Sequence, residues 1–185
     1  MYLPGHLAMG YLVAAGPAVA RRRPLDVRYA LIPALIGSVT PDAIDKPLHA
    51  LEWIDHSRAV GHSLFFLLLL YLIWRILRAR DIDFARPFGW WTAGVASHFF
   101  ADFSNDIFRG IEARGFFFSS WMGWPVVEFE ALQIVWELGE HIQVHPTFTS
   151  LEIAVYALTL VVAMASRRYQ KSPTFDSSTS PIEGN

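Results

Sequence analysis

Five apolar segments dominate this chain and restrict the folds open to it. They cover residues 1–20, 29–39, 64–77, 88–103 and 151–165. Their length and low charge are those of helices that cross a lipid bilayer, with 29–39 short for a full span. In hydrocarbon, backbone polar groups must be bonded internally, and a helix does this within one segment. We therefore predict an all-α, polytopic membrane helical bundle with about five spans.

The composition agrees with a single membrane domain. The chain has 185 residues, 53% of them hydrophobic and 15% aromatic, and its mean hydropathy is +0.30. We assign residues 1–170 to one membrane-embedded domain and 171–185, rich in Ser and Thr, to a disordered tail. Residues 104–150 are expected to form an outer aromatic loop region in the lipid headgroup layer. A net charge of −2 offers no basic field for nucleic acid.

The basic residues are distributed unevenly and predict the topology. Segments 21–30, 75–86 and 167–185 hold 4, 4 and 3 of them, which is 11 of the 15 in the chain. Because Lys and Arg favour cytoplasmic loops, these segments are placed inside and the N-terminus outside. All histidines then fall at the outer ends of spans or in outer loops: His6, His49, His56, His62, His98, His141 and His145.

The polar residues in the apolar segments suggest a metal site. His98 and Asp102 are four residues apart and share one helix face. Burying such groups in an apolar helix is costly unless they pair or bind a metal ion. The predicted topology brings His6, Asp42 and His62 to the same membrane face. Since the chain has no cysteine, one or two divalent ions, with zinc expected, would be held by imidazole and carboxylate alone.

The polar stretch 42–61 separates the second and third apolar segments. Thr40 can cap a new helix that has Pro41 at its first position, and Pro47 is expected to interrupt any long helix. We therefore predict a loop or a short surface helix there. In the first apolar segment, Gly10 and Gly16 are expected to allow close helix packing.

Four stretches around these polar residues carry a resemblance to a known family. They read Gly5-His6, Pro41-Asp42-Ala43-Ile44-Asp45-Lys46-Pro47, Arg58-Ala59-Val60-Gly61-His62-Ser63-Leu64 and Ser97-His98-Phe99-Phe100-Ala101-Asp102. Their order and spacing resemble the YdjM-like family of membrane-bound, metal-dependent hydrolases, over about residues 1–105. The resemblance implies a helical membrane protein distantly related to zinc-dependent phospholipase C, whose biological substrate is unassigned.

The resemblance also implies roles for individual residues. The family's motif histidines and aspartates match five residues, which are the expected metal ligands: His6, Asp42, His62, His98 and Asp102. The motif arginine matches Arg58. Many members read Pro-Asp-x-Asp, whereas here one further residue separates the two aspartates, so we place Asp45 beside the ligands rather than among them. Arg58 and Asp45 are the expected catalytic residues, with Arg58 steadying negative charge and an aspartate orienting or deprotonating water.

We therefore predict hydrolysis of an ester or phosphoester, lipid or lipid-linked by location, at the non-cytoplasmic face. Two alternatives remain open. The same cluster would serve a non-enzymatic protein that binds or transports a metal ion, although transport needs polar groups that continue toward the cytoplasm and 29–39 and 64–73 hold few. The pair His98 and Asp102 would also suit a structural contact between helices, with no metal. His49, His141 and His145 are expected to be ordinary loop residues.

Overall fold

The computed structural model of the chain describes residues 3–54, 58–108 and 146–170. Within these ranges the regular structure is entirely helical, which confirms the all-α prediction for the described part of the chain. The elements are α1 (Leu3–Ala20), a short π-helix η1 (Val27–Leu31), α2 (Ile32–Ala50), α3 (Leu64–Ala79), α4 (Ala85–Phe108) and α7 (Pro146–Gln170).

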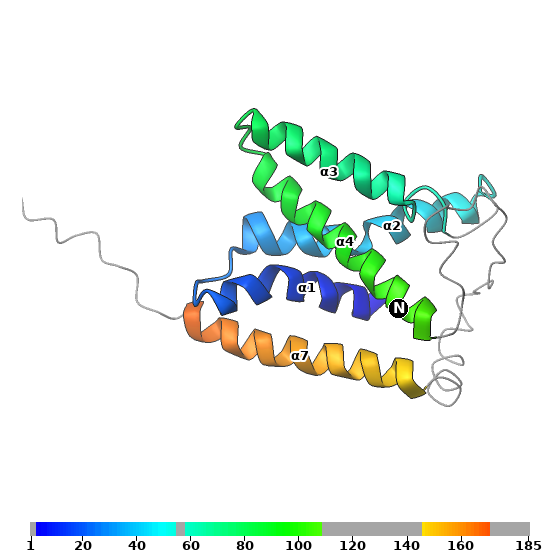
Figure 1. Cartoon of the computed structure of the whole chain (residues 1–185). Coiled ribbons are helices and arrows are strands. Elements are labelled where there is room, and N and C mark those ends of the chain that lie inside the picture. The colour runs from blue at the N-terminus through cyan, green and yellow to red at the C-terminus, as the bar shows by residue number, and fades with distance from the viewer. Residues whose placement is uncertain (1–2, 55–57, 109–145, 171–185) are drawn as a thin grey trace, which may run out of the picture.

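The helices form a bundle built around α1, α2 and α4. The interface between α2 and α4 is the most extensive, and α1 packs against α2, α4 and α7. Helix α3 contacts mainly α4 and lies at the edge of the bundle, while α7 covers the other side of α1 (Figure 1). The start of α1 lies beside the C-terminal part of α4 (Figure 1).

Small residues allow α2 and α4 to approach closely. A Cβ on Gly94 would meet the backbone oxygen of Ala34, and one on Gly37 would meet that of Trp91. Gly10 brings α1 against Ser38 in the same way, which confirms its predicted role, since its Cβ would lie 2.6 Å from Ser38 Oγ. The prediction for Gly16 was wrong, because a Cβ there would have no neighbour within 4 Å among the described residues outside its own helix.

We predicted a loop or a short surface helix over residues 42–61, which is wrong for residues 42–50 because they belong to a long helix. Helix α2 continues through Thr40, Pro41 and Pro47 to Ala50. Thr40 does not cap a new helix; its hydroxyl donates to the carbonyl of Ile36 at 2.8 Å. A proline removes one helical hydrogen bond and bends a helix, but does not end it where packing fixes the flanking turns. Pro41 is such a case, since it is almost fully buried.

The predicted aromatic loop over residues 104–150 is wrong at both ends. Helix α4 runs beyond Asp102 to Phe108, and α7 begins at Pro146, so the two helices take residues from both ends of the predicted loop. Residues 109–145 lie outside the described part of the chain, as does the predicted tail after Gln170.

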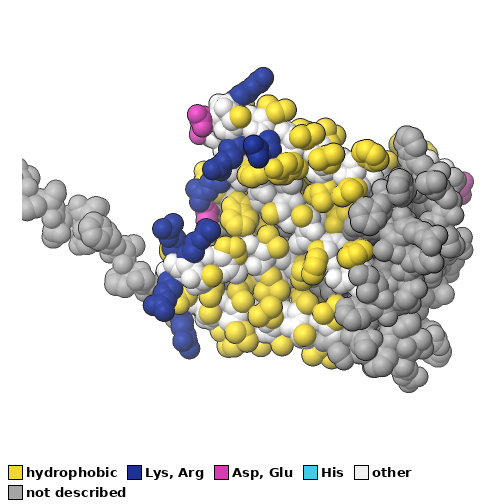
Figure 2. All heavy atoms as spheres, in the orientation of Figure 1, with side chains coloured by type: hydrophobic (Ala, Val, Ile, Leu, Met, Phe, Trp, Pro, Cys, Tyr) yellow, Lys and Arg dark blue, Asp and Glu magenta, His cyan; other side chains and the backbone are white. Residues whose placement is uncertain are grey.

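The bundle exposes a broad apolar surface. Figure 2 shows hydrophobic side chains across one flank, with Lys and Arg side chains gathered at one end. The exposed groups include Phe65, Leu68, Leu72 and Ile76 of α3 and Ile153, Leu158 and Val161 of α7. Among the described helices, α1 alone has both the length and the hydropathy of a membrane-crossing helix. At 16 residues, α3 is about 24 Å long.

Replacing Gly94 with alanine should destabilise the bundle, because the new methyl group meets the Ala34 carbonyl. We expect a loss of about 1–3 kcal/mol, as for other overpacked cores. The matched control is Gly16→Ala, which should be neutral or stabilising by up to about 1 kcal/mol because its new methyl group meets no other described part of the chain within 4 Å. Thermal unfolding in detergent measures both, and a Gly94 variant that melts no lower than the Gly16 variant would contradict the close approach of α2 and α4.

Candidate metal centre

Six polar side chains from four segments converge at one end of the bundle, away from the basic end. His98 and Asp102 come from α4, His6 from α1, Asp42 and Asp45 from α2, and His62 from the loop that leads into α3. Burial is nearly complete for most of the cluster, since His98 and Asp45 are 0% exposed, His6 1% and Asp102 3%. Asp42 is half-buried.

Hydrogen bonds at Nδ1 fix which ring nitrogens of His62 and His98 face the centre. His98 Nδ1 donates to the backbone carbonyl of Ser38 at 2.8 Å, and His62 Nδ1 donates to a carboxylate oxygen of Asp45 at 2.8 Å. In both rings Nε2 is therefore the atom left with a lone pair. These two Nε2 atoms lie 3.0 Å apart. Two facing lone pairs repel, so a cation must lie between or beside them, either a proton or a metal ion.

Two carboxylates complete this group of donors. Asp102 Oδ2 lies 3.5 Å from Nε2 of both His62 and His98. Asp42 Oδ1 lies 3.6 Å from His62 Nε2 and 4.0 Å from His98 Nε2. In a tetrahedral zinc site with bonds of 2.0–2.1 Å, neighbouring donor atoms are about 3.3 Å apart. The measured spacings of 3.0 to 4.0 Å bracket that value.

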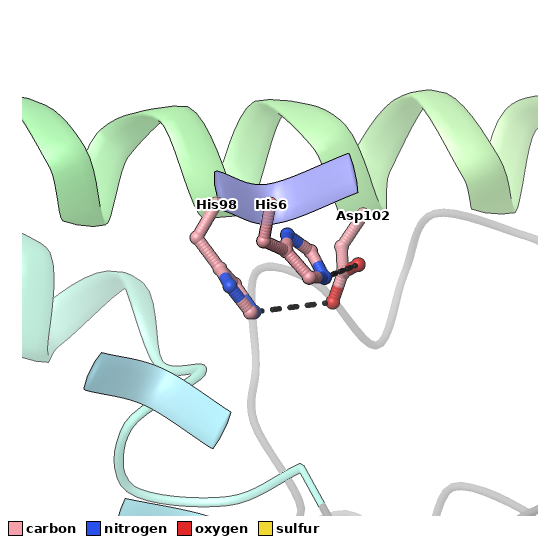
Figure 3. A group of neighbouring side chains, drawn as sticks. All are labelled: His6, His98 and Asp102. Atoms are coloured by element: carbon pink, nitrogen blue, oxygen red, sulfur yellow. Dashed lines mark ion pairs between the residues drawn. The ribbon is translucent and has the colours of Figure 1, made fainter. Parts of the chain in front are cut away.

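His6 lies against both His98 and Asp102. Its ring stacks on that of His98, with centroids 3.8 Å apart and planes at 15°. His6 Nε2 lies 3.4 Å from Asp102 Oδ1, and His98 Nε2 lies 3.5 Å from the other oxygen of the same carboxylate (Figure 3). Two overlapping sets of possible ligands result, His6 with His98 and Asp102, and Asp42 with His62 and His98. The sets share His98, so the centre has donors for one ion or for two adjacent ions.

Asp45 holds the loop that carries His62 instead of facing the centre. Its two oxygens accept backbone N–H bonds from Ala59 at 2.7 Å, Gly61 at 2.8 Å and His62 at 3.1 Å. Together with the His62 ring, this makes four hydrogen bonds. A metal-bound histidine usually gives its other N–H to such a carboxylate, which fixes the ring and raises its basicity. Gly61 is needed there, since a Cβ would lie 2.7 Å from the Pro41 carbonyl oxygen.

Two partly exposed cations border the cluster. Lys46 Nζ lies 2.9 Å from Asp42 Oδ2, and Arg58 Nη2 lies 3.3 Å from Asp102 Oδ2. Their side chains are 63% and 45% exposed. Burial alone lowers the pKa of His62, but the nearby carboxylates of Asp102 and Asp45 outweigh it and raise that pKa above its ordinary value. The cluster thus favours positive charge at its centre.

The donor set fits a divalent metal ion. Three imidazoles and two carboxylates supply the nitrogen and oxygen ligands that zinc and related ions take, and the tautomers of His62 and His98 leave the correct atoms available. One feature remains open: His6 Nδ1 is buried without a hydrogen-bond partner among the described residues.

The structure brings together the five predicted ligand residues, and it places Arg58 and Asp45 next to them. His49 lies elsewhere, with Nδ1 3.2 Å from the carbonyl oxygen of Ile54, while His56, His141 and His145 lie outside the described residues. Sequence reasoning missed Ser38, whose backbone carbonyl orients His98. Every residue has a backbone carbonyl, so the sequence does not mark this contact. Its one signal is the glycines of α2 and α4, which allow the two helices to approach closely.

Asp45→Asn should weaken metal binding while the protein still folds. The amide keeps the size of the side chain but lacks the charge and cannot accept all four hydrogen bonds, so His62 loses its fixed orientation. We expect a loss of affinity of about 10- to 100-fold, measured by zinc titration against a competing chelator. The control is Asp83→Asn, an exposed carboxylate at the basic end; equal affinity in both variants would show that the Asp45 contact does not support the centre.

Comparisons with known proteins agree with this description. No curated protein matches the chain, and no solved structure matches it. Residues 1–171 match the family described as YdjM inner membrane protein. The match includes every residue of the cluster and every described helix. The chain therefore belongs to the YdjM inner membrane protein family.

Proposed function

We propose that this protein is a membrane-bound, metal-dependent hydrolase that acts on an ester or phosphoester at the non-cytoplasmic face. The observation that carries the proposal is the pair of Nε2 atoms of His62 and His98, 3.0 Å apart, with Asp102 Oδ2 3.5 Å from both and Asp42 Oδ1 3.6 and 4.0 Å from them. A structural contact between His98 and Asp102 alone would not need two further donors, from α2 and from the loop before α3.

The residues that would hold the ion are His62, His98, Asp42 and Asp102, with His6 at the second oxygen of Asp102. Zinc is the divalent ion that we expect. When bound, it would lower the pKa of a water molecule and polarise the scissile group.

The chain's own groups suit the remaining steps. Asp42 is the more exposed of the two central carboxylates, at 15% against 4% for Asp102, so it can orient water and accept its proton. The water oxygen bonds to the carbonyl carbon or phosphorus, the bond to the leaving oxygen breaks, and that oxygen takes a proton. Arg58 reaches the cluster from an exposed loop and can bind a developing negative oxygen. Asp45 acts through His62 as a positioning residue.

The transport alternative has less support. Between the cluster and the basic end, the buried groups are mainly apolar, among them Ala14, Ala15, Ala34, Val95 and Leu70, and the buried hydroxyls of Thr92 and Ser166 donate to carbonyls of their own helices. An ion path would need polar groups or water along this line. These side chains favour a centre that opens toward one face only.

His98→Ala should abolish tight metal binding, because His98 belongs to both possible ligand sets. Asp102→Ala should do the same. Elemental mass spectrometry of the purified protein measures its metal content. A chelator should remove both the metal and the activity of the unmodified protein, and added zinc should restore them. His49→Ala is the matched histidine control and should keep the metal. Unchanged metal content in the His98 and Asp102 variants would make the cluster structural and end the hydrolase proposal.

Arg58→Ala should retain the metal and lose turnover. The guanidinium is not a ligand, and its contribution to charge stabilisation is expected to be about 100-fold or more in kcat. Arg58→Lys restores the charge without the planar fork and should recover only part of the rate. Kinetics equal to those of the unmodified protein would make Arg58 an ordinary surface residue, and loss of the metal would place it in the ligand framework.

The proposed topology has about five spans, with the N-terminus outside and the C-terminus in the cytoplasm. It rests on the basic residues gathered at one end of the bundle (Figure 2), which is the end opposite the cluster. Because the chain has no cysteine, single cysteines test it cleanly. Those at Val60 and Ser104 should react with a membrane-impermeant maleimide in intact cells, whereas those at Arg22 and Asp81 should react only after permeabilisation. Labelling of Val60 and Ser104 from opposite sides would refute a shared outer site.

A further inference from the structure

A groove between α3 and α4 lies apart from the metal centre. It encloses about 1390 Å³, and none of the six cluster residues lines it. Its apolar walls include Leu64, Leu67 and Leu68 of α3 and Ala93 and Ala96 of α4. Phe65 and Leu72 of α3 are exposed, so this helix presents apolar side chains both in the groove and outside it. In an inner membrane protein, such a surface meets lipid chains.

One end of the groove carries charges of both signs. Arg78, Asp81, Asp83 and Arg86 line it there, and all four are exposed. Arg86 is already paired, since its Nη2 lies 2.6 Å from Asp26 Oδ2. The side chains of Arg78, Asp81 and Asp83 form no ion pair with any described residue, although the N–H of Asp81 donates to the carbonyl of Arg78 at 3.2 Å. One guanidinium and two carboxylates are therefore available to a ligand at this end.

The indole of Trp74 adds a hydrogen-bond donor to the wall of the groove. Gly89 makes room for it on α4, since a Cβ there would lie 2.5 Å from Trp74 Nε1. Both residues line the groove, and the indole N–H has no acceptor among the described residues. Trp74 precedes Arg78 by about one helical turn, a rise of about 6 Å. Indole rings favour the membrane interface, where the ring is in apolar surroundings and the N–H meets polar groups.

The length of the groove matches the acyl chain of one leaflet. Ala85 and Ala96 both line it, and the eleven residues of α4 between these positions span about 16 Å. A bilayer's hydrocarbon core is about 30 Å thick, so one leaflet is about 15 Å. A lipid whose headgroup lies at the charged end would therefore have its chain along the groove. With the proposed topology, this lipid belongs to the cytoplasmic leaflet.

We infer that the α3–α4 groove binds a phospholipid whose zwitterionic headgroup carries a primary ammonium, as in phosphatidylethanolamine. One acyl chain lies between the two helices, and the Trp74 N–H donates to a glycerol ester oxygen. The phosphate lies beside Arg78, and the ammonium meets the carboxylates of Asp81 and Asp83. This inference goes beyond the proposed hydrolysis and does not depend on it, because the two sites share no residue.

The charges at the end of the groove select among headgroups. Two carboxylates face one unpaired guanidinium, so an anionic headgroup without an ammonium gains one attraction and meets two repulsions. A primary ammonium has three N–H groups and can donate to both carboxylates. A quaternary ammonium, as in phosphatidylcholine, has the charge but no N–H to donate. The groove should therefore prefer phosphatidylethanolamine to both other classes.

Three dioleoyl lipids that differ only in headgroup test this preference: phosphatidylethanolamine, phosphatidylcholine and phosphatidylglycerol. Delipidated full-length protein in detergent is titrated with each, and native mass spectrometry counts the bound lipid. The dissociation constant for phosphatidylethanolamine should be at least about threefold lower than for the other two, the scale expected of exposed ion pairs. Equal constants for phosphatidylethanolamine and phosphatidylcholine, tightest binding of phosphatidylglycerol, or no binding of any of the three would overturn the inference.

Charge variants locate the headgroup. The double variant Asp81→Asn, Asp83→Asn should bind phosphatidylethanolamine no more tightly than phosphatidylcholine. Arg78→Gln should weaken all three lipids, because all carry a phosphate. The matched control is Arg80→Gln, since Arg80 is exposed at the same end of α3 but does not line the groove; it should change no constant. A preference for phosphatidylethanolamine that survives in the double aspartate variant would place the headgroup elsewhere and overturn the inference.

Ala96→Trp locates the acyl chain, because a bulky side chain there fills the apolar end of the groove. The matched control is Ala157→Trp on α7, since both alanines are exposed on helices. The Ala96 variant should bind all three lipids about tenfold more weakly, as expected for the loss of about two methylene contacts, and the Ala157 variant should bind them as before. A dimer that Ala96→Trp converts to monomer would assign the groove to a second copy. A lower melting temperature with lipid binding unchanged would assign it to another segment of this chain.

Discussion

The carboxylate of Asp45 joins α2 to the loop that precedes α3 through four hydrogen bonds. It lies on α2, is fully buried, and accepts N–H bonds from Ala59, Gly61 and His62 and from the His62 ring. A buried charge is stable only when its hydrogen-bonding capacity is used. The loop is thereby fixed against α2 immediately before α3 begins. The direction in which His62 faces the centre follows from this contact.

Close helix packing fixes the other half of the centre. Gly37 and Gly94 bring the backbones of α2 and α4 near enough for the carbonyl of Ser38 to accept a bond from His98. Within a lipid environment, apolar burial adds little to helix association, so small residues and interhelical hydrogen bonds carry more of it. The same contacts that hold α2 against α4 therefore also select the tautomer of His98. Stability of the bundle and the chemistry of the centre depend on one interface.

The sequence was informative about residue types and weak about boundaries. Helical spacing placed His98 and Asp102 on one face, and the family motifs identified the remaining donors. The end of α2 was missed because prolines and polar residues usually mark loops, whereas here Pro41 is packed and the helix continues. Helices α1, α2 and α3 are each followed, two residues after their last residue, by a left-handed residue that is not glycine, namely Arg22, Glu52 and Asp81. Their sequence lacks the usual C-terminal signal, and only the fold shows these ends.

The charge balance of the cluster favours the binding of an additional cation. Asp42, Asp45 and Asp102 meet two basic side chains, Lys46 and Arg58, both of which are exposed enough to be well solvated. The pull of such a cation on a buried carboxylate is weakened by water. The centre therefore retains negative potential at the point where the two Nε2 lone pairs meet. A proton shared between the histidines would relieve their repulsion with a single positive charge, whereas a divalent ion held by both Nε2 atoms would also offset the charge of the nearby carboxylates.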